Sequence, residues 1–166
     1  TGLSDGDNPE VPINPSSLDY VNLLLNNHPT KILVDTGASN TFVSTLLLDK
    51  LHHKPINKQK STYVLADGGT RLQVLGTVEL QIKVKNILTT VTALVTSSLC
   101  TTIIIGSDWL SEYNANIDYH TRTITVKQLH RYASIPMKTD DDNMSYLVRL
   151  QEEIKIPSGH EIVVSA

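Results

Sequence analysis

The residues whose chemistry stands out are Asp35–Gly37, an Asp-Thr-Gly tripeptide that follows the apolar run Ile32–Val34. An apolar run that ends in a small polar turn is typical of a strand presenting a carboxylate. Hydrolysis of a peptide bond by carboxylates needs two of them, because one must deprotonate water while the other, protonated, hydrogen-bonds to the scissile carbonyl. The tripeptide occurs once in the chain. The sequence therefore leaves open where the second aspartate is.

The elements that must position this carboxylate read mainly as strands. Leu18–Leu25 and residues 30–35 predict a hairpin around the turn Asn26-Asn27-His28-Pro29. Residues 61–66 and 71–84 predict a second hairpin around Asp67-Gly68-Gly69-Thr70, with Gly76 marking a bulge or a close backbone approach. Further strands are expected over residues 88–95, 102–105, 116–119 and 123–126, with short helical segments over 45–51 and, capped by Ser107, over 108–113.

Composition and charge exclude several classes of function. The chain has 166 residues, of which 40% are hydrophobic and 5% aromatic, so one domain with a β-rich core is expected. A net charge of −3 gives no electrostatic case for binding nucleic acid or an anionic membrane. The apolar runs are too short to span a bilayer. The single cysteine, Cys100, permits no intrachain disulfide and fits a reducing compartment, which predicts a cytoplasmic location.

An Asp-Thr-Gly tripeptide is also an ordinary turn sequence, but three further motifs follow it in order. They are residues 64–68 (Val-Leu-Ala-Asp-Gly), 76–80 (Gly-Thr-Val-Glu-Leu) and 104–110 (Ile-Ile-Gly-Ser-Asp-Trp-Leu). With residues 33–39, these motifs resemble the retroviral-type aspartic proteases (retropepsins), particularly those of Ty3/gypsy-type LTR retrotransposons. The resemblance implies an all-β acid protease barrel or sandwich with one short helix and a homodimeric active site.

The resemblance also implies a role for each matching residue. Asp35 is the catalytic aspartate, paired with Asp35 of a second identical chain. Thr36 makes a hydrogen-bonded clasp across the two subunits, and Gly37 contacts the substrate backbone. Residues 61–80 are a flap that closes over the peptide. The implied substrate-binding residues are Ala38, Ser39, Ala66, Asp67, Gly68, Gly69 and Ile104, and the implied structural residues are Gly106 and Asp108.

Two positions depart from the retroviral pattern. Ser107 stands where retroviral enzymes usually carry an arginine that forms ion pairs near the interface, which puts the strength of the dimer in doubt. Asp108 is then expected to cap or brace the following helix. Asp67 makes the flap tip acidic, which either biases substrate choice and pH response or is a plain turn aspartate.

Metal chemistry finds little support in the sequence. His52 and His53 are adjacent but lack a well-spaced cysteine or carboxylate partner, so we predict no metal and no cofactor. We predict three segments: a flexible leader over residues 1–17, the protease domain over 18–128, and a linker and C-terminal spacer toward the next polyprotein domain over 129–166.

The sequence-based prediction is thus an aspartic endopeptidase that processes a retroelement polyprotein, in the cytoplasm or within virus-like particles. Its expected partners are a second copy of the chain and an extended peptide, with no nucleic acid and no membrane. A catalytically silent dimerisation or peptide-binding module derived from a retroelement is the alternative.

Overall fold

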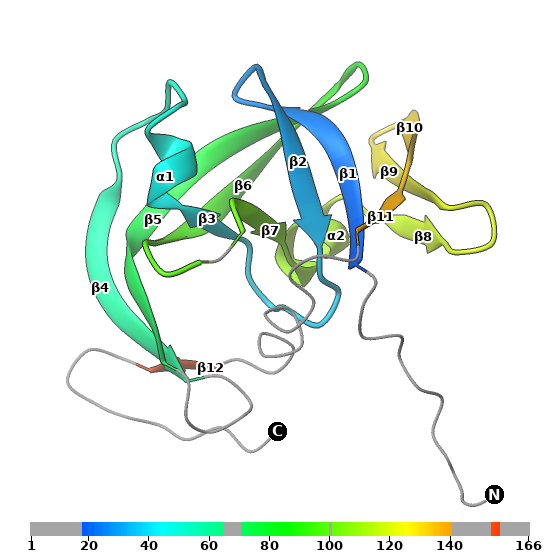
Figure 1. Cartoon of the computed structure of the whole chain (residues 1–166). Coiled ribbons are helices and arrows are strands. Elements are labelled where there is room, and N and C mark those ends of the chain that lie inside the picture. The colour runs from blue at the N-terminus through cyan, green and yellow to red at the C-terminus, as the bar shows by residue number, and fades with distance from the viewer. Residues whose placement is uncertain (1–17, 65–70, 100, 141–153, 157–166) are drawn as a thin grey trace, which may run out of the picture.

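A computed structural model of the chain describes residues 18–64, 71–99, 101–140 and 154–156 (Figure 1). These residues form mostly β-strands, which confirms the predicted all-β class. They contain two short helices, where the predicted fold class counted one. The predicted leader over residues 1–17 and the predicted flap tip, with Ala66, Asp67, Gly68 and Gly69, lie outside the described residues.

The first hairpin joins strand β1 (Leu18–Leu25) to strand β2 (His28–Val34), which confirms the predicted hairpin. Its turn is two residues shorter than predicted, because His28 and Pro29 already pair with β1. Its turn consists of Asn26 and Asn27, with φ angles of 48° and 67°. Two consecutive left-handed residues match the right-handed twist of the strands they connect, and asparagine tolerates this conformation better than most residues. The hairpin therefore sets the register of β2, and with it the position of Asp35.

The second hairpin joins strand β4 (Asn57–Val64) to strand β5 (Arg71–Val84). The register shifts between Lys58 and Ser61, opposite Gly76, so the predicted irregularity at this glycine is confirmed. A Cβ on Gly76 would lie 2.3 Å from the carbonyl oxygen of Asn57. The sequence predicts that the first strand of this hairpin starts at residue 61, but β4 begins at Asn57, because polar side chains suit the exposed face of an edge strand.

The strands close into a barrel through one extra pairing. The main sheet has the order β11-β1-β2-β7-β3-β6-β5-β4-β12, and β1 also pairs with β5 at Leu24–Lys83 and Leu25–Ile82. This order includes β3 (Phe42–Ser44), β6 (Ile87–Thr96) and β7 (Ile103–Ile105). Along β5, buried and exposed side chains alternate, and the buried ones, including Leu80 and Ile82, fill the barrel.

Two short helices pack against the strands, α1 (Thr45–Leu48) against β3 and α2 (Ser107–Glu112) against β6 and β7. Helix α1 begins after Ser44, whose side chain accepts a hydrogen bond from the Leu47 amide at 3.1 Å. Helix α2 begins after Gly106, so the prediction of Ser107 as its N-cap is wrong by one residue. Trp109 of α2 is 2% exposed and donates from Nε1 to Thr89 Oγ1 at 2.8 Å, which anchors the helix on β6.

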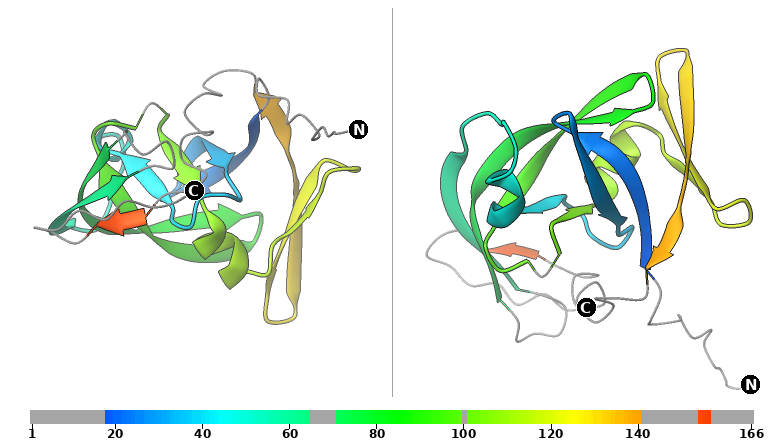
Figure 2. Two further views of the ribbon diagram at one scale, coloured as in Figure 1. Left: turned by 90° about the horizontal axis from the view of Figure 1, so that it is seen from below. Right: turned by 45° about the horizontal axis from the view of Figure 1, so that its top comes forward.

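The chain continues as folded structure beyond residue 128. Strands β8 (Asn116–Asp118), β9 (Thr123–Gln128) and β10 (Arg131–Pro136) form a three-stranded sheet beside the barrel (Figure 2). Strand β11 (Lys138–Asp140) then pairs with β1, and β12 (Ile154–Ile156) pairs with β4. The sheets therefore extend past the predicted domain end at residue 128, because backbone pairing joins β10 and β11 to earlier strands.

Within the described ranges, no helix is long and apolar enough to cross a membrane.

Candidate active site

Asp35 lies at the carboxyl end of β2, where the strand gives way to a tight turn. Strand β2 pairs in parallel with β7, Leu33 opposite Ile104 and Val34 opposite Ile105. The Asp35 amide continues this pairing and donates to the carbonyl oxygen of Ile105 at 2.9 Å. Ile32 and Leu33 of β2 and all three residues of β7 are buried, and Val34 packs against the core, so the backbone that leads into Asp35 is fixed by the core.

Residues 35–38, here called the Asp35 turn, are closed by two hydrogen bonds to Asp35. The Gly37 amide donates to Asp35 Oδ1 at 3.0 Å, and the Ala38 amide donates to the Asp35 carbonyl oxygen at 3.1 Å. Thr36 and Gly37 are exposed, whereas Ala38 is fully buried. The turn therefore presents its Thr-Gly tip outward while fixing one oxygen of the carboxylate.

The second carboxylate oxygen of Asp35 is in a different situation. Asp35 is 7% exposed, and its Oδ2 is buried with no hydrogen-bond partner among the described residues. Burial raises the pKa of the Asp35 carboxyl above its usual value of 3.8. The hydrogen bond from the Gly37 amide to Oδ1, with a smaller effect of the nearby Ala38 amide, opposes part of this rise. A buried polar atom without a partner is costly, so this oxygen requires an explanation.

Behind the turn, Thr41 and Asp108 connect three segments of the chain. Thr41 Oγ1 donates to Asp108 Oδ1 at 2.8 Å, and the Thr41 amide donates to Asp108 Oδ2 at 3.1 Å. The Gly106 amide donates to Thr41 Oγ1 at 3.2 Å, and the Trp109 amide donates to Asp108 Oδ1 at 2.8 Å. Asp108 therefore braces the start of α2 and the strand that leaves the Asp35 turn.

Gly106 allows these segments to approach closely. A Cβ at this position would lie 2.4 Å from the Asn40 carbonyl oxygen and 2.7 Å from that of Ala38. The neighbouring Ser107 amide donates to the same Ala38 oxygen at 2.7 Å. Any larger residue at 106 would separate β7 from the Asp35 turn.

Ile104 belongs to a separate apolar cluster that connects the floor of the site to the β4–β5 hairpin. It is fully buried, and the cluster, here called the hairpin cluster, consists of Leu33, Phe42, Tyr63, Leu72, Val74, Leu94 and Ile104. The rings of Phe42 and Tyr63 meet edge to face, with centroids 5.7 Å apart and planes at 79°. The β4–β5 hairpin is thus packed on the strand pair that carries Asp35.

Residues 31–134, more than half of the chain, match the PEG10/RTL1 protease domain. The chain belongs to the PEG10/RTL1 protease domain family.

Two solved structures are similar to this PEG10/RTL1-family chain. The retroviral protease-like domain of Ddi1 from Leishmania major is 18% identical, with a TM-score of 0.56 over 75% of this chain and 97% of that one. EIAV protease complexed with the inhibitor HBY-793 is 22% identical, with a TM-score of 0.46 over 65% of this chain and 99% of that one. The likeness to the Ddi1 domain concerns the fold, and it confirms the predicted retropepsin-like fold.

In this member of the PEG10/RTL1 protease family, the predicted site residues fall into three groups. Asp35, Thr36, Gly37 and Ala38 form the turn, Ser39 is exposed just after it, and Gly106 and Asp108 lie behind it. Ile104 lies under the β4–β5 hairpin. The four predicted tip residues fall outside the described residues. The role of Thr41 was not predicted, because a single sequence gives no signal that a threonine will hydrogen-bond to an aspartate 67 positions away.

The structure offers no alternative centre at the histidines. His53 Nδ1 donates to the Lys54 carbonyl oxygen at 2.6 Å, and both histidines border a cavity with Asn26, Asn27, Glu79 and Gln81. Among the residues that the structure describes, no group of three His, Cys, Asp or Glu side chains could hold a metal ion. The predicted lack of a cofactor stays a prediction.

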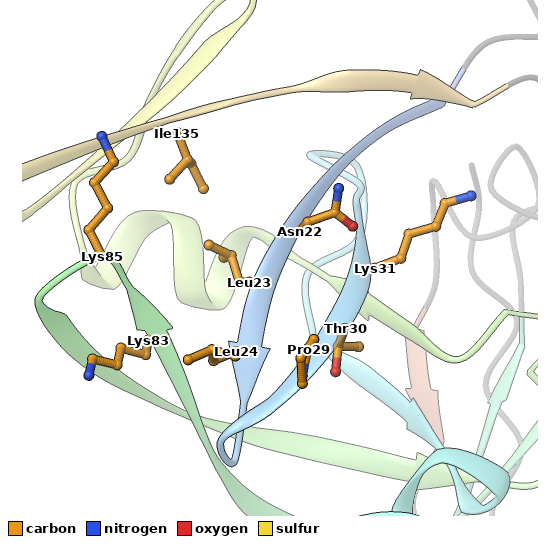
Figure 3. Close-up of a pocket in the computed structure, with 9 residues that line it drawn as sticks. All are labelled: Asn22, Leu23, Leu24, Pro29, Thr30, Lys31, Lys83, Lys85 and Ile135. Carbon is orange, nitrogen blue, oxygen red and sulfur yellow. The ribbon is translucent and has the colours of Figure 1, made fainter.

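A cavity of about 530 Å³ lies away from Asp35, between the β1–β2 hairpin, the end of β5 and β10 (Figure 3). Its lining residues are Asn22, Leu23, Leu24, Pro29, Thr30, Lys31, Lys83, Lys85 and Ile135. Figure 3 shows the amino groups of Lys31, Lys83 and Lys85 pointing in different directions rather than toward a common point. The cavity therefore lacks the convergent polar groups that a small-molecule site requires.

Proposed function

We propose that the chain is an aspartic endopeptidase whose catalytic pair consists of Asp35 from each of two identical chains. The observation that carries this proposal is the buried Oδ2 of Asp35, which has no partner within the described part of its own chain. A second carboxylate across a two-fold axis would give this oxygen a partner and would share one proton with it. The retropepsin-like fold and the family of protease domains support the same reading.

The chemistry follows from the position of the Asp35 turn. The ionised carboxylate removes a proton from water, whose oxygen attacks the carbonyl carbon of the scissile peptide bond. The protonated carboxyl hydrogen-bonds to the carbonyl oxygen. As the C–N bond breaks, the leaving amine takes one proton from the carboxyl pair, which thereby returns to its singly protonated state. The raised pKa of Asp35 favours the state in which the pair keeps one proton. Thr36, exposed beside Asp35, is available for the cross-subunit clasp.

The proposed substrate is an extended segment of a Ty3/gypsy-type retroelement polyprotein. An extended peptide would pair through its main chain with the β4–β5 hairpin and with the backbone at residues 37–39. Apolar side chains of the peptide would pack near the hairpin cluster, which includes Ile104. The proposal places the flap tip, Ala66 to Gly69, over this peptide.

Hydrolysis of a denatured generic protein at pH 4–6 tests the activity. The wild-type chain should release peptides, and Asp35→Asn should reduce the rate at least about 1,000-fold, since the pair loses a group that both holds and transfers the proton. Asp49→Asn, at an exposed aspartate next to α1, is the matched control and should retain the wild-type rate. Equal rates in wild type and Asp35→Asn would favour the silent binding module instead.

The shared site requires a separate test of assembly. Light scattering over a concentration series gives the fraction of dimer, and the rate per chain should rise with that fraction. A rate per chain that is constant while the protein stays monomeric would contradict a catalytic pair made by two chains.

A further inference from the structure

The outer edge of β4 is occupied by another segment of the same chain. On its inner side, β4 pairs with β5, and on its outer side Thr62, Tyr63 and Val64 pair with Ile156, Lys155 and Ile154 of β12. Figure 1 shows β12 at the end of β4 that leads to the hairpin tip. An edge strand offers unpaired N–H and C=O groups that bind any extended segment of matching register. Here the segment comes from the C-terminal part of the chain.

The two halves of β4 differ in a way that matches this pairing. Lys58 and Lys60, in the first half, are exposed, and lysines on an edge strand oppose the addition of another strand. The second half lacks charge, and Ser61 and Tyr63 are buried there. Strand β12 covers the uncharged half, which is the part of the edge open to strand addition.

The covered half of β4 is also the half nearest the candidate active site. Tyr63 belongs to the hairpin cluster with Ile104 and Leu33, and Leu33 lies two residues before Asp35. An extended peptide bound under the hairpin would therefore compete with β12 for the edge at Thr62–Val64.

The C-terminal stretch reaches both edges of the main sheet. Strand β11 pairs with Leu18–Tyr20 of β1, and Tyr20 pairs in turn with Leu33 of β2. The chain then returns at β12 on the opposite edge of the sheet. Because β12 belongs to the same chain as β4, its effective concentration at the β4 edge is in the millimolar range. A separate peptide that binds weakly would need a similar concentration to displace it.

We propose that Ile154–Ile156 is a cis-acting strand that occupies the outer edge of β4 and competes there with extended peptide substrates. The proposal rests on the proposed function in one respect, since the competitor is the substrate of that site. The Ile-Lys-Ile sequence alternates apolar and polar residues, as a half-buried strand does. The β4 edge is thus a strand-addition site whose resident occupant is the chain itself.

Hydrogen exchange in full-length Asp35→Asn protein tests the pairing without any proteolysis. Adding Lys155→Pro and Ile156→Pro removes two consecutive amide donors. Successive amides of a strand point to opposite sides, so one of these two faces β4 and its hydrogen bond is lost. Exchange at Thr62–Val64 should then accelerate about tenfold or more. Lys155→Ala with Ile156→Val keeps both donors and should leave exchange unchanged, and unchanged exchange in β5 and β6 checks that the fold is intact.

Equal protection of Thr62–Val64 in the proline and control variants would overturn the proposal. Protection that rises with protein concentration would also overturn it, because a second copy of the chain would then supply the strand.

Peptide binding tests the competition. A fluorescent synthetic peptide of residues 150–160 should bind the proline variant about tenfold more tightly than the control variant, with both proteins carrying Asp35→Asn. The reason is that apparent affinity is proportional to the fraction of molecules whose β4 edge is free of β12. In protein that retains Asp35, the same proline pair should lower KM for a cleaved peptide by a similar factor.

The two proposals fail in different ways. A chain that cleaves nothing but shows the exchange and binding differences rejects the protease while keeping the cis-acting strand. An active protease with equal KM and equal peptide binding in both variants rejects the cis-acting strand alone.

Discussion

Thr41 and Asp108 join two segments that lie 67 residues apart, through a hydroxyl–carboxylate hydrogen bond of 2.8 Å and an amide–carboxylate hydrogen bond of 3.1 Å. The Thr41 hydroxyl is fully buried and also accepts from the Gly106 amide. This one side chain therefore connects the segment that follows the Asp35 turn, the end of β7 and the start of α2.

Thr41→Val should lower the free energy of unfolding by about 1–3 kcal/mol. The substitution keeps the shape of the side chain but leaves the Gly106 amide without its acceptor and removes one of the two donors to Asp108 Oδ1. Urea denaturation at pH 7 measures the change. Glu112→Gln, at an exposed position of α2, is the control and should stay within about 0.5 kcal/mol of wild type. A Thr41→Val protein as stable as the control would contradict the bracing role.

Gly106→Ala and Ser107→Ala should have very different effects on stability. A methyl group at 106 would meet the Asn40 carbonyl oxygen at 2.4 Å, so backbone must move, at a cost of about 3 kcal/mol, the upper part of the range for overpacking. Within the described residues, α2 has no side-chain N-cap hydrogen bond, and Ser107 is its first residue. Ser107→Ala should therefore change stability by less than about 0.5 kcal/mol.

Thermal and urea unfolding of the two variants, measured side by side, provide the check. A loss of about 1 kcal/mol or more in Ser107→Ala would restore the prediction that Ser107 caps the helix. A Gly106→Ala protein with wild-type stability would show that the close approach is relieved without cost.

Local sequence signals predict the elements near Asp35 well. The Asn26–Asn27 turn, the alternation along Arg71–Val84 and the apolar run before Asp35 each act within a few residues, so their strands are recognisable from the sequence. Strand β3 has three residues, Phe42–Ser44, all buried, and so short a segment shows no periodicity. The first four residues of β4 were not predicted as strand, because their side chains are all polar and exposed and show no alternation.

The candidate site was predictable in part. The turn at Asp35 and the structural roles of Gly106 and Asp108 are implied by the resemblance that the ordered motifs carry. The bond between Thr41 and Asp108, the burial of Asp35 Oδ2 and the pairing of β12 with β4 depend on contacts between distant segments. A single sequence carries no local signal for such contacts, so these features emerge only in three dimensions.

The stability of the isolated chain should fall as pH rises through the pKa of Asp35. Burial raises this pKa in the folded chain above 3.8, so between the two values the folded chain binds more protons than the unfolded chain. The free energy of unfolding therefore decreases with pH across that window, and the loss persists at higher pH. Asp35→Asn lacks this titration, so it should gain stability relative to wild type between pH 3 and pH 7.

Urea denaturation at both pH values, at protein concentrations where light scattering gives the monomer mass, measures this difference. Asp49→Asn leaves Asp35 in place, so its free energy of unfolding should still show the decrease with pH that Asp35 causes in wild type. If Asp35→Asn and wild type change stability in parallel from pH 3 to pH 7, the pKa of Asp35 is not raised in the monomer.

The packing of the β4–β5 hairpin on the site should show up as coupling between Phe42 and Tyr63. Their rings meet edge to face at 5.7 Å inside the hairpin cluster, and such pairs contribute about 0.5–1.5 kcal/mol beyond the area they bury. Phe42→Leu, Tyr63→Leu and the double variant form a cycle whose coupling energy, from urea denaturation, should fall in this range. Trp109→Phe combined with Phe42→Leu is the matched control, because Trp109 lies in the other core cluster and should add its effect independently. Additive effects of Phe42→Leu and Tyr63→Leu would mean that the contact between the two rings adds nothing to the packing of β4 on the floor of the site. The ring contact would then not be what holds the edge at Thr62–Val64 near Asp35.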